Sequence, residues 1–517
     1  MNELLQTIGY DRWILPVLLL LPLAGVALVL LGPERWARWT TLVVAFAELV
    51  LSLGLWWAFD PSAGGVQVSF NMSWIPQWGI NFTLGIDGLS LFMVLLSTAM
   101  MPLLVWGSWY AIDTKVRGYY ALLLALKTGM IGVFVALDLF LFYCFWEVLL
   151  IPMYFIIGTW GSANRLYAST KFVVYTFAGS ILMLVAIIAM AIIVGKATGE
   201  YSFAYQHLLQ HRDVLEPYAP WLFSAFALAF AVKVPIFPLH TWLPDAHVEA
   251  PTAGSVDLAV ILLKMGTYGF MRFAIPFFPA FALSSAVSAV FVSVAVIGIV
   301  YAALVSMVQT DLKKLIAYSS VSHLGFVMLG IWGGTVQSVQ GAIIVMIAHG
   351  ISTGALFFLV GMLYERRHTR MLHDFGGLAR VTPVLATAFV ITALASIGLP
   401  GLNGFVGEFL VLLGAFGRYP WAVGIATLAV VFSAGYMLWA VQRVFFNGLT
   451  HDENRTLPDA TGRELAVLVP LIAAMIWMGL YPQPILRRTE AAARRYVELV
   501  EPYREGARQP AQAATAE

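Results

Sequence analysis

The chain has 517 residues, of which 60% are hydrophobic and only 11% are charged, whereas soluble domains carry about 25% charged residues. This composition excludes an ordinary soluble domain, and the net charge of +1 gives no indication of a nucleic-acid partner. The single cysteine, Cys144, excludes an internal disulfide and a cysteine-ligated cluster.

Apolar stretches follow one another along the whole chain, and each has about the 20 residues that a helix needs to cross a bilayer. Fourteen such stretches are centred near Leu20, Val50, Ser97, Met130, Trp146, Leu184, Ala229, Leu263, Ser293, His323, His349, Ile397, Val431 and Ala473. The first has no convincing cleavage site, so we expect a retained helix and not a signal peptide. A β-barrel would show short alternating strands instead. The sequence therefore predicts an all-α polytopic membrane protein with about fourteen transmembrane helices.

Loops rich in Lys and Arg alternate with loops that lack them, and basic residues are retained on the cytoplasmic side of a membrane. The basic loops contain Arg35 and Arg38, Lys115 and Arg117, Arg165 and Lys171, Lys313 and Lys314, and Arg366, Arg367, Arg370 and Arg380. Residues 60–84 contain no Lys or Arg. The loop "DAHVEAP" (245–251) should be inside yet lacks a basic residue, which is the one exception. The pattern predicts a multi-pass protein of the bacterial inner membrane, with both termini on the periplasmic side.

Two of the predicted helices contain breaks. The seventh, "AVKVPIFPLHTWLPDAH" (231–247), contains Pro235 and Pro238, and the twelfth, "SIGLPGLNGFVGEFL" (396–410), contains Pro400 among four glycines. A proline inside a helix frees a carbonyl one turn earlier, and a membrane tolerates this only where protein or water satisfies the freed group. Broken helices at matching positions, five segments apart, are typical of inverted repeats around a midplane transport site.

This pattern divides the chain into five predicted parts. They are three N-terminal transmembrane helices (1–112), a first five-helix repeat (113–275), an inverted second five-helix repeat (280–449), a last transmembrane helix (450–484), and a surface helix with a polar tail (485–517).

Six ionisable side chains are predicted at membrane depth, where burying a charge costs roughly 2.5–3.5 kcal/mol on insertion scales. Lys233 ends a half-helix, where free carbonyls favour an ammonium, and Glu408 lies about one turn into another, where free amides favour a carboxylate. The others are Glu147, Lys264, His323 and His349. A mixture of carboxylate, ammonium and imidazole groups suits proton transport better than transport of a bulky solute.

Each of these side chains also has a structural interpretation, namely a static ion pair, a hydrogen bond between helices, or a helix cap. These interpretations apply to Glu147 with Lys264, to His323 and His349, and to Glu408, respectively, and for Lys233 the alternative is a purely structural role beside the helix break. His240 and His247 are expected to be structural. The sequence contains no glycine-rich phosphate loop after a strand and no HExxH-type spacing, so we expect no NAD, flavin or zinc site in this chain.

Five motifs carry a resemblance to a known family. They are "LDLFLFYCFWEVLLIPMYFIIGTWG" (137–161), "KVPIFPLHTWLPDAHVEAPTAGSV" (233–256), "LLKMGTYGFMRF" (262–273), "DLKKLIAYSSVSHLGFVMLG" (311–330) and "GLPGLNGFVGEFLVL" (398–412). They resemble the antiporter-like subunits of proton-pumping NADH:quinone oxidoreductase, respiratory complex I. The resemblance covers nearly the whole chain and implies fourteen helices, with inverted repeats at helices 4–8 and 9–13. Glu408 narrows the resemblance to one of three related subunits, because the other two carry lysine at this position and this one carries glutamate.

The resemblance implies a role for each of the six side chains. Glu147 would pair with Lys233, Lys264 would be the central lysine, His323 and His349 would bridge two half-channels, and Glu408 would be the outer terminal of the relay. Quinone reduction elsewhere in the complex would then separate Glu147 from Lys233 and push a proton toward Lys264. From there the proton would move through ordered water and the histidines to Glu408.

The resemblance also implies cofactors and partners. NADH, FMN, iron–sulfur clusters and quinone are expected in partner subunits, with no cofactor and no metal in this chain. The expected partners are other membrane-arm subunits, including two related antiporter-like subunits, together with lipids. Lys127 and Asp257 depart from the family pattern, and Asp257 lies two turns before Lys264 on roughly the same helix face. We interpret these two as groups near water with little role, or as extra relay or access sites.

Two other functions stay open. A subunit of an Mrp-type Na⁺/H⁺ antiporter or of a membrane-bound hydrogenase would share the architecture, although Glu408 argues against the first. A passive helical scaffold would not need six ionisable groups at membrane depth.

Overall fold

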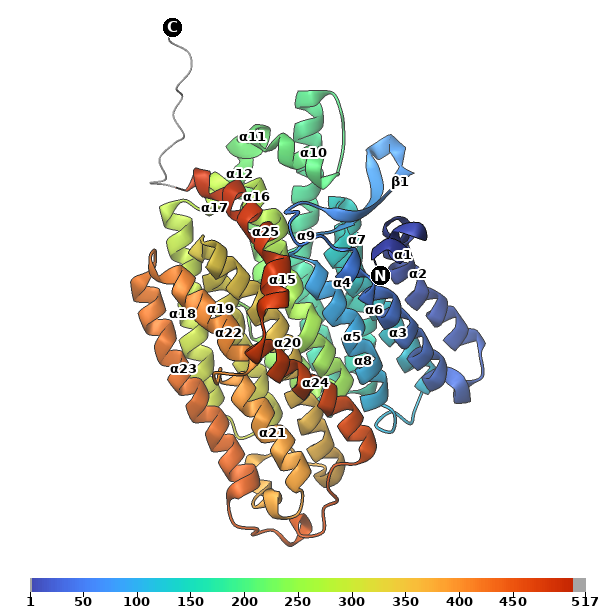
Figure 1. Cartoon of the computed structure of the whole chain (residues 1–517), viewed down its shortest axis with the longest axis vertical. Coiled ribbons are helices and arrows are strands. Elements are labelled where there is room, and N and C mark those ends of the chain that lie inside the picture. The colour runs from blue at the N-terminus through green and yellow to red at the C-terminus, as the bar shows by residue number, and fades with distance from the viewer. Residues whose placement is uncertain (1, 505–517) are drawn as a thin grey trace.

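The described part of the chain, residues 2–504 of a computed structural model, is almost wholly helical (Figure 1). Its N-terminal elements are α1 (Asn2–Thr7), α2 (Tyr10–Leu31), α3 (Ala37–Leu53), α4 (Leu55–Ala58), β1 (Gln67–Ile75), β2 (Ile80–Ile86) and α5 (Leu91–Gly107). Then follow α6 (Val116–Val135), α7 (Leu139–Val148), α8 (Leu150–Trp160), α9 (Arg165–Thr198), α10 (Tyr205–Gln210), α11 (Arg212–Leu215), α12 (Ala219–Lys233), α13 (Trp242–Glu249), α14 (Thr252–Asp257), α15 (Leu263–Gly269), α16 (Ile275–Phe277) and α17 (Pro279–Ala282). The remaining helices are α18 (Ser285–Met307), α19 (Leu312–Gly333), α20 (Val336–Arg367), α21 (Pro383–Ser396), α22 (Asn403–Phe416), α23 (Pro420–Val441), α24 (Gly462–Leu480) and α25 (Gln483–Val500).

All fourteen predicted membrane segments are helical. Within residues 2–504, twelve helices are long and apolar enough to cross a membrane. The other two predicted segments are α5, which has 17 residues, and the pair α21 and α22, which a break divides. The chain is therefore a multi-pass helical membrane protein, as predicted.

Polar side chains and prolines set the ends of several helices. Asp138 and Asp311 accept hydrogen bonds from backbone N–H groups in the first turns of α7 and α19, respectively. Thr335 and Thr461 form capping boxes at the starts of α20 and α24. Both α21 and α23 begin with proline, whose missing N–H costs nothing at a first helical position.

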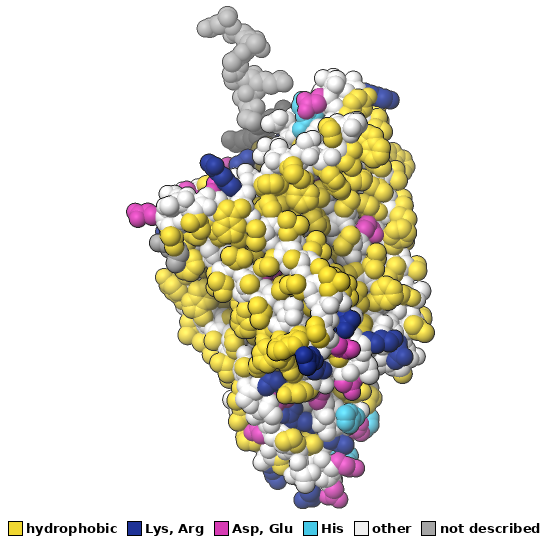
Figure 2. Space-filling view, turned by 90° about the vertical axis from the view of Figure 1, so that its right-hand side faces the viewer, with side chains coloured by type: hydrophobic (Ala, Val, Ile, Leu, Met, Phe, Trp, Pro, Cys, Tyr) yellow, Lys and Arg dark blue, Asp and Glu magenta, His cyan; other side chains and the backbone are white. Residues whose placement is uncertain are grey.

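The innermost helices differ from the outer ones in burial. The apolar windows of α20 and of the segment from α14 to α16 are buried along their whole length, and that of α19 is nearly so. In the outer helices α2, α18 and α23 less than half of the apolar window is buried, which is the pattern expected of lipid-facing helices. Figure 2 shows hydrophobic side chains over the upper and middle parts of one face. The ionisable residues of the innermost helices are therefore shielded from lipid.

The strands β1 and β2 form an antiparallel hairpin that was not among the predicted elements. Its turn contains Gly79 in the left-handed region, at φ 68°. The end of β2 is joined to the start of α7, since Leu137 donates a backbone hydrogen bond to Thr83 and the Asp138 carboxylate accepts one from Asn81. The hairpin thus fixes the outer end of α7.

The two ends of the molecule differ in charge. In Figure 1 the described C-terminal end lies at the upper end beside α17, and α1 lies in the same half of the molecule, below the hairpin. The basic loops gather at the opposite end, where Figure 2 shows Lys, Arg, Asp, Glu and His side chains together. After α24, α25 runs across the bundle and packs against α20, where Gln340 donates to the Leu486 carbonyl at 2.8 Å. The polar tail predicted at the C-terminus lies mostly outside the described residues.

Candidate functional site

The first break lies directly after Lys233, as the two prolines predict. The carbonyl of Ala231 accepts from the backbone N–H of Ile236 at 2.9 Å, and the carbonyl of Val232 accepts from the Trp242 indole at 2.8 Å. Protein groups therefore satisfy the carbonyls that Pro235 frees, which is the condition for a break inside a membrane.

Lys233 itself is completely buried, at 0% exposure. Its ammonium lies 5.2 Å from the centre of the Trp146 ring and 5.6 Å from that of Phe172, and it has no hydrogen-bond partner within residues 2–504. A buried ammonium over two aromatic rings is held by their faces more weakly than by a carboxylate. Lys233 is thus placed to gain or lose a partner.

Glu147 lies near the point where α7 gives way to α8 and is half-buried. Tyr143 and Ser180 lie beside its carboxyl group, and Lys233 interacts with it electrostatically. In the described part of the chain the two do not form a salt bridge, and one carboxyl oxygen of Glu147 has no partner. The structure therefore brings Glu147 and Lys233 near each other without joining them.

Lys264 lies in α15 between two π-helical turns, Leu258–Leu262 and Phe270–Ala274, and is completely buried. Its ammonium donates to the carbonyl of Ala259 and lies 2.6 Å from Nδ1 of His349 on α20. A proton in this contact belongs either to the amine or to the imidazole, because the two nitrogens share one hydrogen bond. Helix residues that are 85 positions apart thus form one proton-sharing pair.

The contacts continue from His349 to the second break. The rings of His349 and His323 have centroids 5.6 Å apart. Nδ1 of His323 lies 2.8 Å from Oε1 of Glu408, and Ser396 lies 3.4 Å from the other ring nitrogen. An imidazole can take a proton at one nitrogen and release one at the other. Lys264, His349, His323 and Glu408 therefore lie in one buried row, with a gap between the two rings, and we call it the relay row.

Glu408 lies in α22, beyond the break that contains Pro400. The break turns at Gly398, whose φ is 76°, and a Cβ at this position would lie 3.1 Å from Oε2 of Glu408. On the other side of the break, Asn403 donates to the carbonyl of Ala348 at 3.3 Å. The left-handed turn and the close carboxylate both favour glycine at 398.

His247 lies closer to the row than the sequence indicates. It is completely buried and stacked on Phe357 at 4.7 Å, and neither ring nitrogen has a partner within residues 2–504. It interacts electrostatically with Lys264 and with Lys313. No described contact joins Lys233 to Lys264 directly.

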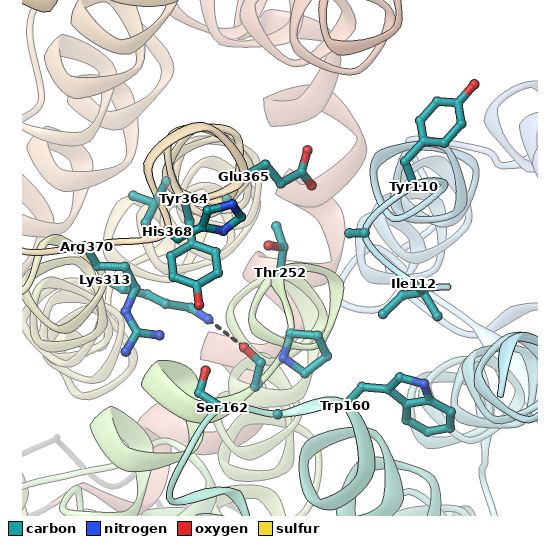
Figure 3. A pocket seen from close by; sticks show the side chains of 16 residues that line it. Tyr110, Ile112, Trp160, Ser162, Thr252, Lys313, Tyr364, Glu365, His368 and Arg370 are labelled. Carbon is teal, nitrogen blue, oxygen red and sulfur yellow. Dashed lines mark hydrogen bonds between the residues drawn. The ribbon is translucent and has the colours of Figure 1, made fainter. Parts of the chain in front are cut away.

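A cavity of about 520 Å³ is lined in part by residues of the basic loops (Figure 3). Lys313 and Arg370 line one side, and Tyr364 with Glu365 and His368 line another. Lys313 donates to the carbonyl of Ala250 at 2.6 Å, just after α13. The cavity thus brings solvent to Lys313, which interacts electrostatically with His247.

Three ionisable residues were missed or undervalued from sequence. Glu48 lies in the middle of an apolar stretch and met the criterion used for Glu147. Lys313 was counted only as a loop charge, because its burial comes from tertiary packing. His247 follows a helix break, and its position in the sequence does not indicate which side chains surround it in the structure. No group of three or more His, Cys, Asp or Glu side chains that could hold a metal ion occurs among residues 2–504.

Comparison with known proteins gives the family. Residues 136–433 match the family described as "NADH:quinone oxidoreductase/Mrp antiporter, TM". A relative in Rhodobacter capsulatus, named NADH-quinone oxidoreductase subunit M, is 45% identical over 486 residues, which cover 91% of this chain and 93% of the relative.

Solved structures agree with this match. A chain of respiratory complex I from Thermus thermophilus with bound NADH is similar, with a TM-score of 0.85 and 34% identity over 94% of this chain and 99% of that one. A chain of the Mrp complex from Dietzia has a TM-score of 0.79 at 24% identity, covering 93% of this chain and 52% of that one, and shares the fold.

Proposed function

Because this chain belongs to the NADH:quinone oxidoreductase/Mrp antiporter transmembrane family, we propose that it is the M-type antiporter-like subunit of a proton-translocating NADH:quinone oxidoreductase. The observation that carries the proposal is the relay row, in which an ammonium, two imidazoles and a carboxylate contact one another inside the membrane. A passive scaffold has no need of such a row, since each charge is costly at this depth.

The row transfers protons in a defined order of atoms. Lys264 shares a proton with Nδ1 of His349, His349 faces His323 ring to ring, and Nδ1 of His323 exchanges a proton with Oε1 of Glu408. Water molecules carry the proton across the gap between the two rings. Each transfer keeps the total charge of the row constant, so the proton moves without a separate counter-ion.

The Glu147 and Lys233 pair couples the row to the rest of the complex. Quinone reduction in another subunit moves Glu147 relative to Lys233, and Lys233 loses the carboxylate that helps it to hold a proton. The released proton passes toward Lys264. The position of Lys233 over aromatic rings supports this role, because it leaves the ammonium without a permanent hydrogen bond.

Protons reach the row from the end with the basic loops. The cavity of Figure 3 brings solvent to Lys313, and His247 interacts electrostatically with both Lys313 and Lys264. An imidazole with two unpartnered nitrogens suits a relay position.

The chain works as one part of a translocase in the bacterial inner membrane, with both termini on the periplasmic side. NADH, FMN, iron–sulfur clusters and quinone bind to partner subunits. The exposed apolar faces of the outer helices contact lipid and other membrane-arm subunits, including two related antiporter-like subunits.

Glu408→Gln in the assembled enzyme tests the row. We expect NADH-driven proton uptake into inverted membrane vesicles to fall by about tenfold or more, because the terminal carboxylate can no longer take up a proton. Glu464→Gln is the matched control, since Glu464 is equally buried but bound to Arg366 at 2.6 Å. Full pumping by assembled Glu408→Gln enzyme would refute the row, and loss of pumping in both variants would make the effect structural.

A further inference from the structure

A second cluster of ionisable side chains is buried apart from the relay row. Glu48 lies on α3, Lys127 on α6 and Asp257 at the end of α14, and their exposed fractions are 0%, 0% and 1%. Helix α6 packs against α3 on one side and against α15 on another. Lys127 interacts electrostatically with both Glu48 and Asp257. The lysine therefore interacts with carboxyl groups from two different helices.

The groups of this cluster are not bonded to one another. The Lys127 ammonium, both carboxyl oxygens of Glu48 and one of Asp257 have no hydrogen-bond partner within residues 2–504, and no salt bridge joins them there. The hydroxyl of Tyr119, which interacts electrostatically with Asp257, is also buried and unpartnered. A static ion pair would show direct contacts, so the arrangement is more open than the pair of Arg366 and Glu464.

Counting charges shows what such a cluster needs. Two carboxylates and one ammonium leave a net charge of −1 when all three are ionised, and an uncompensated charge is costly at this depth. One bound proton makes the cluster neutral. A metal cation would do the same, but it would have to lie beside the Lys127 ammonium, which repels it.

We propose that Glu48, Lys127 and Asp257 form a second proton-binding site, which holds one proton on one of its two carboxyl groups. The bound proton forms the O–H bond of one carboxylic acid, while the other carboxyl group stays a carboxylate and Lys127 stays charged. This site goes beyond the relay row and does not depend on the direction of transfer along it.

The geometry of the helix separates this site from the row. Asp257 and Lys264 are seven residues apart, which in an α-helix places them on one face. The π turn Leu258–Leu262 lies between them and has a wider spacing than an α-helix, so it rotates the residues that follow. Asp257 consequently interacts with Lys127 on α6, whereas Lys264 contacts His349 on α20.

Infrared spectroscopy of the purified, assembled enzyme at pH 7 tests the site. Glu48→Gln and Asp257→Asn each leave Lys127 with one carboxylate, a neutral pair that needs no proton. We therefore expect each variant to lose the C=O band of one protonated carboxylic acid, identified by its shift in D₂O. Lys127→Met should gain one such band, because both carboxyl groups must then be protonated to be neutral.

Other outcomes would overturn the proposal. If Glu48→Gln and Asp257→Asn lose only carboxylate bands, and Lys127→Met gains no acid band, the three residues form an ionised structural cluster. A carboxylate band that changes when Na⁺ replaces K⁺ would identify a cation site instead. Glu464→Gln is the control and should lose only carboxylate bands, because Arg366 holds that group ionised. If Glu48→Gln does not assemble, the result for Asp257→Asn alone decides whether the site exists. Glu48→Asp should keep the C=O band of the protonated carboxylic acid.

Discussion

At the scale of single residues, the contacts of each buried ionisable side chain decide how readily it can gain or lose a proton. Lys264, His323 and Glu408 are already in hydrogen-bonded contact with a neighbour in the row, whereas Lys233 has only aromatic rings around it. The mobile step of the proposed mechanism therefore lies at the Glu147 and Lys233 end.

Lys233→Ala should separate assembly from pumping. The variant keeps the helix break, because Pro235 and the Trp242 hydrogen bond are unchanged, and we expect normal subunit content in the membrane. Proton uptake should fall by about tenfold or more, since the group that releases the proton is gone. Lys196→Ala is the control, because Lys196 is exposed at the end of α9. Wild-type pumping by an assembled Lys233→Ala enzyme would remove Lys233 from the mechanism.

Gly398→Ala should disturb Glu408 directly. The alanine would have to adopt a left-handed backbone conformation, and its Cβ would lie 3.1 Å from Oε2 of Glu408. We therefore expect a loss of stability of about 1–2 kcal/mol together with weaker pumping. Gly401→Ala is matched, because Gly401 has φ 93° and its Cβ would meet only Leu480 at 3.9 Å. Thermal unfolding should report a similar loss for both variants, while proton uptake should fall only for Gly398→Ala. Equal pumping by the two would contradict the placement of Glu408.

At the scale of elements, the sequence predicted much and missed two features. The fourteen helical segments and both breaks follow from apolar length and from proline positions, which are local properties. The hairpin β1–β2 was missed, although polar and apolar residues alternate along its strand Gln67–Ile75, which is the pattern typical of a strand. The π turns were missed as well, since nothing in Leu258–Leu262 distinguishes a π turn from an α-helix.

The contacts between the site residues also could not be predicted from the local sequence. The six candidate side chains were chosen by their depth in apolar segments, and the structure places four of them in one row. The contact between His323 and Glu408 joins residues 85 positions apart, and it depends on how α19 packs against α22. A direct pair of Glu147 with Lys233 is not observed in the described residues, because Lys233 lies over Trp146 and Phe172.

Asp138 at the start of α7 makes stability depend on pH. Burial raises the pKa of Asp138 to about 6, against hydrogen bonds from Asn81, Leu141 and Phe140 that lower it. The folded protein thus binds this proton more tightly than the unfolded chain, so the stabilisation is present at low pH and is lost as pH rises through about 6. Asparagine carries no charge, and we expect the apparent Tm of Asp138→Asn relative to wild type to improve by a few degrees between pH 5 and pH 8.

Asp60 provides the control for this pH dependence. It is fully exposed, and hydrogen bonds from Ser62 lower the pKa of its carboxyl group. It therefore stays ionised throughout the interval from pH 5 to pH 8, and the Tm of Asp60→Asn relative to wild type should not change there. An equal pH dependence in both variants, measured by thermal unfolding of the purified enzyme, would show that burial of Asp138 is not the cause.

At the scale of the whole molecule, the basic loops and the chain termini indicate the same orientation in the membrane. The basic loops lie at one end, and both described termini lie toward the other (Figure 1). Alkaline phosphatase fused after Arg504 should therefore be active in intact bacterial cells, because that enzyme works only outside the cytoplasm. A fusion after Thr310, in a basic loop, should be inactive. The reverse result would invert the orientation and place the cavity of Figure 3 on the periplasmic side.

The lone thiol of the chain has a practical use. Cys144 is half-buried on α7, three residues before Glu147 and thus on the same side of that helix. Cyanylation would replace the S–H hydrogen by a cyano group and give a thiocyanate, whose C≡N stretching frequency responds to the local electric field. A single vibrational reporter, with no engineered cysteine in this chain, would then record whether the field beside Glu147 changes while the enzyme turns over.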